Sequence, residues 1–134
     1  MENKINREQA EIEFNKWAFE TKKISERKMA KSEMVDAKEE FIENIIDGTF
    51  SIDSEGNVVQ KLKFPIGDFS EFTYKPRMNL AEMQKMKQFK TGDDIGKSKA
   101  IMSVLTDRNM GVIDKMDSND MVNSMCITMF YMVG

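Results

Sequence analysis

The stretch that decides the fold, residues 49–75, reads Thr49-Phe-Ser-Ile-Asp-Ser-Glu-Gly-Asn-Val-Val-Gln-Lys-Leu-Lys-Phe-Pro-Ile-Gly-Asp-Phe-Ser-Glu-Phe-Thr-Tyr-Lys75. Apolar and polar residues alternate in it three times, which is the period-two pattern of half-buried strands. Turn residues at 53–57 and 66–68 separate the three runs. Pro65 ends the second run or places it at a sheet edge. The pattern predicts a three-stranded antiparallel meander, and its second strand directs one set of side chains to a common face: Val58, Gln60, Leu62 and Phe64.

Helical periodicity precedes this sheet. Residues 6–23 carry a single apolar stripe, and Asn6 stands where a helix cap is expected. Residues 25–47 form a second helix, which we expect to be interrupted near Ser32. Gly48 follows it in the position of a left-handed C-terminal cap. The sequence therefore predicts a helical pair before the sheet.

Helical periodicity returns after the sheet. A helix is expected from Asn79, which can cap it, and its inner face would contain Leu80 and Met83. A second helix covers about residues 94–105, and a short helical turn lies around Val112. The last helix follows Asp117 and is apolar over more than half of its circumference. These short helices are expected to form a C-terminal bundle.

The predicted fold class is therefore α+β. The chain has 134 residues, which suffice for one domain or for a small domain with an appendage. We divide it into an N-terminal helical segment, residues 1–48, and a second unit, residues 49–134. The second unit contains the small sheet and the C-terminal helical bundle.

Composition narrows the class of protein. No apolar run approaches the roughly 18–20 residues that span a bilayer, and the N-terminus has no apolar signal-peptide core. The single cysteine, Cys126, excludes an intrachain disulfide. The net charge is −3, and the lysines of the mildly basic middle segment are scattered. This distribution favours a solvated surface over nucleic-acid binding. We expect a cytosolic protein with neither a membrane nor a nucleic acid as partner.

The sequence indicates no catalytic residue, cofactor or metal ligand. The chain has no histidine, which removes zinc sites and serine–histidine or cysteine–histidine chemistry within one chain. The run from Gly92 to Ser98 is one residue too short between its glycines for a phosphate loop. Asp114, Asp117 and Asp120 fit an acid-rich helix start better than a catalytic cluster. We expect Cys126 to be a buried, inert thiol, and we predict that the protein is not an enzyme. Carboxylate catalysis is the remaining enzymatic alternative, although no converging pair of acids can be named.

Methionine suggests a surface for a protein partner. Ten of the 13 methionines lie from Met78 onward, and those of the last helix recur at helical spacing. Methionine is flexible and polarizable, so it suits surfaces that accept apolar helices, although packing in the core is the alternative. The second side of the last helix would be covered by a partner or by another copy through residues 110–133. The candidate partner-binding residues are Met83, Met86, Met121, Met125, Met129, Met132, Phe14 and Trp17.

Four segments carry a resemblance to a known family. They are Val59-Gln-Lys-Leu-Lys-Phe-Pro-Ile66, Phe72-Thr-Tyr-Lys-Pro-Arg-Met-Asn-Leu-Ala-Glu-Met83, Ile101-Met-Ser-Val-Leu-Thr106 and Val112-Ile-Asp-Lys-Met-Asp-Ser-Asn-Asp120. Over about residues 58–130 the chain resembles the tail assembly chaperones of tailed bacteriophages. Methionines stand where that family usually has leucine or alanine, and residues 1–57 lie outside its core pattern.

The resemblance implies a non-enzymatic escort in the host cell cytoplasm. Such a protein binds the long, aggregation-prone tape-measure protein, keeps it soluble during tail assembly and leaves before the tail is finished. Two alternatives stay open. One is a small phage-type inhibitor or accessory protein that blocks a host or defence complex by surface binding, with the charged segment from Glu20 to Glu40 as its contact. The other is a structural subunit of the virion.

Overall fold

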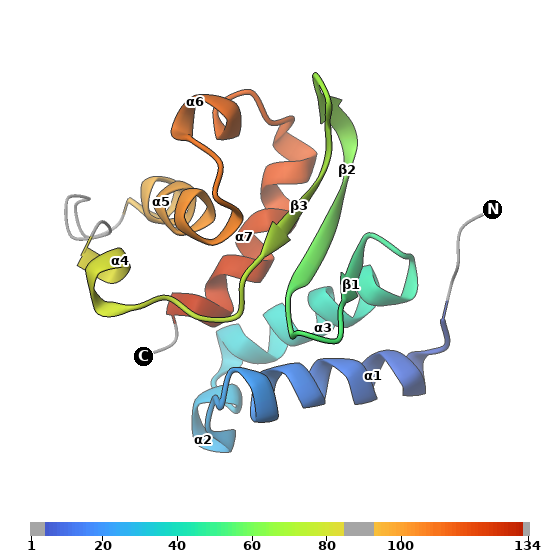
Figure 1. The fold of residues 1–134 in the computed structure, drawn as a ribbon. Coiled ribbons are helices and arrows are strands. Elements are labelled where there is room, and N and C mark those ends of the chain that lie inside the picture. Colours follow the sequence, from blue (N-terminus) through green and yellow to red (C-terminus); the bar gives the residue numbers. More distant parts are fainter. Residues whose placement is uncertain (1–4, 85–92, 133–134) are drawn as a thin grey trace.

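Helices precede and follow a three-stranded antiparallel sheet in the computed structural model, which describes residues 5–84 and 93–132 (Figure 1). The predicted α+β fold class is confirmed. The first elements are α1 (Arg7–Asn15), the π-helical segment η1 (Lys16–Thr21), α2 (Glu26–Met29) and α3 (Ser32–Ile46). The predicted interruption near Ser32 separates α2 from α3, whereas the helix expected over 6–23 changes from α to π geometry at Lys16.

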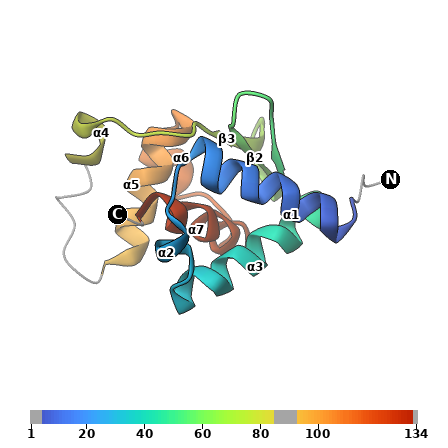
Figure 2. The same cartoon turned by 90° about the horizontal axis from the view of Figure 1, so that it is seen from below.

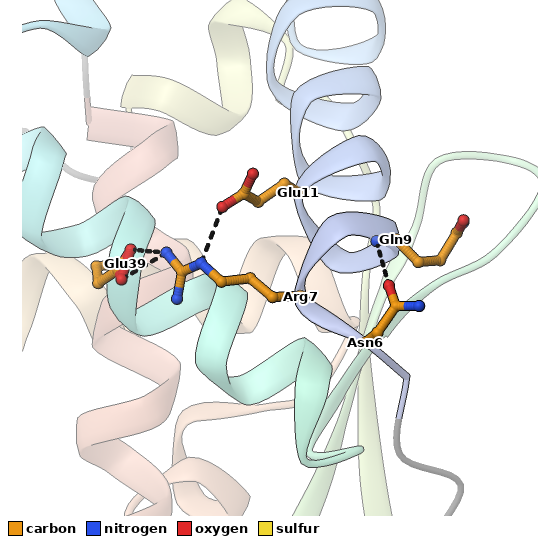
Figure 3. A network of polar contacts seen from close by, with 5 residues as sticks. All are labelled: Asn6, Arg7, Gln9, Glu11 and Glu39. Carbon is orange, nitrogen blue, oxygen red and sulfur yellow. Dashed lines mark hydrogen bonds and ion pairs between the residues drawn. The ribbon is translucent and has the colours of Figure 1, made fainter.

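Polar contacts define the start of α1 (Figure 3). The Asn6 side chain accepts a hydrogen bond from the Gln9 N–H at 2.8 Å, so the predicted cap is confirmed. The next residue, Arg7, donates to Glu11 on its own helix and to Glu39 on α3. The Arg7 guanidinium lowers the pKa of the Glu39 carboxyl. These exposed contacts link the beginning of α1 to the middle of α3.

The sheet is the predicted meander. It contains β1 (Phe50–Ile52), β2 (Val58–Ile66) and β3 (Phe69–Tyr74) in the order β1-β2-β3. One prediction about β2 was wrong, namely that Phe64 lies on the buried face, whereas Pro65 lies beyond the residues that pair with β1, as an edge position requires. The strand continues through Pro65 to Ile66, and Phe64 is 51% exposed instead of sharing the buried face of Val58, Gln60 and Leu62. The reason is an irregularity in the β2–β3 register between Lys61 and Ile66, which interrupts the alternation of faces.

The C-terminal helices are α4 (Leu80–Gln84), α5 (Asp94–Thr106), α6 (Met110–Ile113) and α7 (Ser118–Met132). Asn79 and Glu82 form a reciprocal capping box at α4, and Asp93 caps α5. The expected inner face of α4 was wrong, because Leu80 is 71% exposed and Met83 is 48% exposed. The structure describes five residues of this helix, and none of them is buried. Within the described ranges, no helix is both long and apolar enough to span a bilayer.

An aromatic cluster joins the two ends of the described chain. Phe14 of α1 and Trp17 of η1 meet Phe41 of α3 with ring-centroid distances of 5.3 and 5.0 Å. Phe130 of α7 lies 5.4 Å from Phe14 and 5.5 Å from Phe41. Figure 2 shows α7 beside α1 and α3 when the molecule is seen from below. The hydrophobic core therefore contains residues from both sides of residue 48.

A buried polar network ties α7 to the sheet. The Asp120 carboxylate accepts hydrogen bonds from the Lys63 and Phe64 N–H groups at 2.9 and 3.0 Å. The Asp120 backbone carbonyl accepts from Gln60 Nε2 at 3.0 Å. The Tyr74 hydroxyl donates to Gln60 Oε1 at 2.7 Å. Because Asp120, Gln60 and Tyr74 are almost fully buried, these bonds fix the position of α7 relative to β2.

Replacing Asp120 tests this network. Asp120→Ala leaves two backbone N–H groups of β2 without their carboxylate, so we expect the free energy of unfolding to fall by about 2–4 kcal/mol. Urea denaturation measures the change. The control is Asp114→Ala, which removes an exposed ion pair with Lys99 and should cost less than about 1 kcal/mol. Equal effects of the two substitutions would contradict a special role for Asp120.

Candidate functional site

The candidate surface lies on α7. We call Met121, Val122, Met125, Met129 and Met132 the methionine face. An α-helix turns by about 100° per residue, so these five side chains fall within an arc of about 100°. Val122 is 62% exposed, and the four methionines are half-buried. The structure thus brings the four predicted methionines of α7 together on one partly exposed stripe.

The rest of the α7 circumference is covered by the protein itself. The helix contacts α3, α5 and β2. Its buried residues include Ile127 and Phe130, which belong to the hydrophobic core, and Thr128, whose hydroxyl lies 3.0 Å from that of Ser98 on α5. The methionine face is the side that these contacts leave partly open.

The other predicted partner-binding residues lie elsewhere. Met83 is on α4, at the periphery of the molecule in Figure 1. Met86 lies outside the described residues. Phe14 and Trp17 have exposed fractions of 0% and 1% and lie in the aromatic cluster, so neither is available on the surface of the folded chain. Phe14 and Trp17 therefore pack in the core and do not form a partner-binding surface.

The three aspartates considered for acid chemistry do not converge. Asp114 pairs with Lys99, and Asp117 accepts a hydrogen bond from the Asn119 N–H at the start of α7. Asp120 is buried in the polar network with β2. Across residues 5–84 and 93–132, no group of three or more cysteine, aspartate or glutamate side chains has the arrangement of a metal site. Each acid thus has a structural role of its own.

Two concavities that the sequence did not suggest lie along α1 and β1. One measures about 650 Å³ and includes Glu13, Phe50 and Lys61 in its lining. The other measures about 360 Å³ and includes Glu13, Ile12 and Ile52. Their lining residues come from separate parts of the chain and form no motif, so only the fold brings them together. Neither concavity includes a residue of the methionine face.

No protein-family model, curated protein or solved structure matches this chain. The fold and the surface define a small α+β protein whose last helix is packed on most sides and presents methionines on the remaining one.

The predicted inert thiol provides a test of how α7 is packed. Cys126 is buried, its Sγ donates to the Ala37 carbonyl oxygen at 3.4 Å, and burial raises its pKa to about 12. A shift of about three units lowers the thiolate fraction at neutral pH roughly thousandfold. We expect a disulfide reagent to label Cys126 at least that much more slowly in the native chain than in urea. Similar rates in both states would show that this side of α7 is open.

Proposed function

We propose that the chain is a non-enzymatic tail assembly chaperone that binds a tape-measure protein in the host cytoplasm and keeps it soluble. The observation that carries the proposal is the methionine face. It presents four flexible thioether side chains and the exposed Val122 along one line of a helix. Surfaces of this type accept the apolar stripe of a partner helix and adapt to differences in its shape. A tape-measure protein is a long helical chain with such stripes.

The contacts that hold the buried side of α7 in place favour a binding role for the methionine face. Asp120 and Ser124 bond to the buried side chains of β2 and β3, and Phe130 packs into the aromatic cluster. The backbone of α7 is therefore held in place, and its half-buried methionines have intrinsically flexible side chains. A rigid helix with adaptable side chains lowers the ordering cost of binding without restricting the partner to one sequence.

The order of elements is consistent with the resemblance to the chaperone family. The segment 59–66 lies in β2, and the segment 72–83 leads from β3 through a Lys-Pro-Arg sequence into α4. The segment 101–106 lies in α5, and 112–120 connects α6 to the start of α7. The net charge of −3 would help to keep a complex with an apolar partner in solution.

Co-expression with the tape-measure protein from the same genome tests the proposal. We expect a soluble complex that contains several copies of this chain, because a long partner offers repeated apolar stripes. Size exclusion with light scattering measures the stoichiometry. A tape-measure protein that stays insoluble while this chain elutes alone would contradict the proposal. A stoichiometric complex with a host enzyme would then favour the inhibitor alternative.

A triple substitution locates the contact. Met121, Met125 and Met129 are changed together to glutamine, which makes the methionine face polar and should abolish the soluble complex. The matched control changes the same three residues to leucine, which keeps the surface apolar at similar volume and should retain binding. Circular dichroism verifies that both variants remain folded. If the folded glutamine variant binds as well as the wild type, the contact lies elsewhere.

A further inference from the structure

Two cationic side chains connect segments that are distant in sequence, because each donates a hydrogen bond to the backbone of the other segment. Lys22 follows η1, and its Nζ donates to the Pro76 carbonyl oxygen at 3.0 Å. Arg77 lies in the connection from β3 to α4, and it donates in return to the Thr21 carbonyl oxygen at 3.1 Å. Lys22 Nζ also lies 3.5 Å from the ring centroid of Tyr131 on α7. Three parts of the fold therefore meet at one pair of cations.

Neither cation has an acidic partner in the part of the chain that the structure describes. The ion pairs found there involve Arg7, Lys75 and Lys99 as the cations. Burial, and then the nearby charge of Arg77, lower the pKa of Lys22 to about 8. The fold thus holds two like charges near each other without a neutralising carboxylate.

The backbone at this place is also unusual. The chain leaves the π-helical geometry of η1 directly before Lys22, and Lys23 then adopts a positive φ of 56°. A residue with a side chain is uncommon in this conformation, which glycine usually occupies at the end of a helix. Both π-helical turns and positive φ angles at residues other than glycine are found disproportionately often at functional sites, where the surrounding structure maintains them.

We propose that Lys22 and Arg77 form a binding site for an oxyanion, either a phosphate or a carboxylate group. An ammonium has three N–H donors and a guanidinium has five, and each of these side chains uses one on a backbone carbonyl. The remaining donors can bind an oxyanion in charge-assisted hydrogen bonds. The anion would remove the repulsion between the two cations, while Tyr131 supports the lysine through its ring face. This site is independent of the methionine face and of the proposed chaperone function.

Titration of the full-length chain tests the site. Inorganic phosphate and, separately, acetate are added at constant ionic strength with chloride as the balancing anion, so that general screening stays the same. NMR follows the side-chain signals of Lys22 and Arg77. We expect saturable shifts of both residues and a higher pKa of Lys22 in the bound state. Tighter binding of phosphate identifies a phosphate group as the ligand, and equal or tighter binding of acetate identifies a carboxylate. The absence of saturation with both anions overturns the proposal.

The pH dependence of acetate binding gives a second readout. Acetate keeps its charge near pH 8, so a change in affinity around this pH comes from titration of a group on the protein. Arg77 stays charged in this range, and burial raises the pKa of Tyr131 above its usual value, so that the phenol stays neutral. Affinity should therefore fall as the pH rises through about 8, where Lys22 loses its proton. Affinity that stays constant across this range overturns the role of Lys22.

Substitutions complete the test. Lys22→Gln and Arg77→Gln should each weaken anion binding about tenfold or more, because each removes a charged donor. Lys63→Gln is the matched control, since this exposed lysine lies on β2, away from the site, and should leave affinity unchanged. If Lys22→Gln does not fold, the exposed Arg77 provides the decisive variant. Equal affinities in all folded variants overturn the proposal.

Discussion

Phe130 packs against Phe14, Trp17 and Phe41, and the arrangement of the whole molecule depends on this contact. It joins the last helix to α1, η1 and α3, which are far from the last helix in sequence. Tilted and edge-to-face aromatic pairs add about 0.5–1.5 kcal/mol each beyond the area they bury, so a cluster of four rings is a strong reason to bring these elements together. The change of periodicity at residue 48 therefore marks a change of secondary structure inside a shared core.

The polar network complements the aromatic cluster. Hydrophobic packing brings α7 to the sheet but tolerates small shifts along the helix, whereas buried hydrogen bonds do not. Asp120 and Ser124, one turn apart, bond to groups on β2 and β3 and so determine which residues of α7 face inward. The orientation of the methionine face follows from this, because the same rotation that buries Ser124 directs Met125 and Val122 outward.

Local patterns predicted the elements well, and contacts between distant residues account for the errors. Alternation identified the three strands, and polar residues at the right spacing identified the caps at Asn6 and Asn79. Phe64 was placed on the wrong face because the β2–β3 register is irregular at this point, where the Asp120 carboxylate, from another element, binds two successive N–H groups of β2. The pair of Lys22 and Arg77 could not be predicted, since each side chain contacts a backbone carbonyl of a remote segment and leaves no motif.

The chain itself covers most of the last helix. Its nearly continuous apolar circumference suggested that both sides are buried, with a partner or a second copy as one candidate cover and core packing as the alternative. In the structure, α3, α5 and β2 cover more of that circumference than the periodicity alone implied. A partner would therefore meet the outer edges of half-buried methionines and the exposed Val122 rather than a deep groove. Shallow contacts of this kind give modest affinity for each copy, and one long chain offers many such contacts. An escort that coats a partner and later leaves it needs this combination, because each single contact is easily reversed.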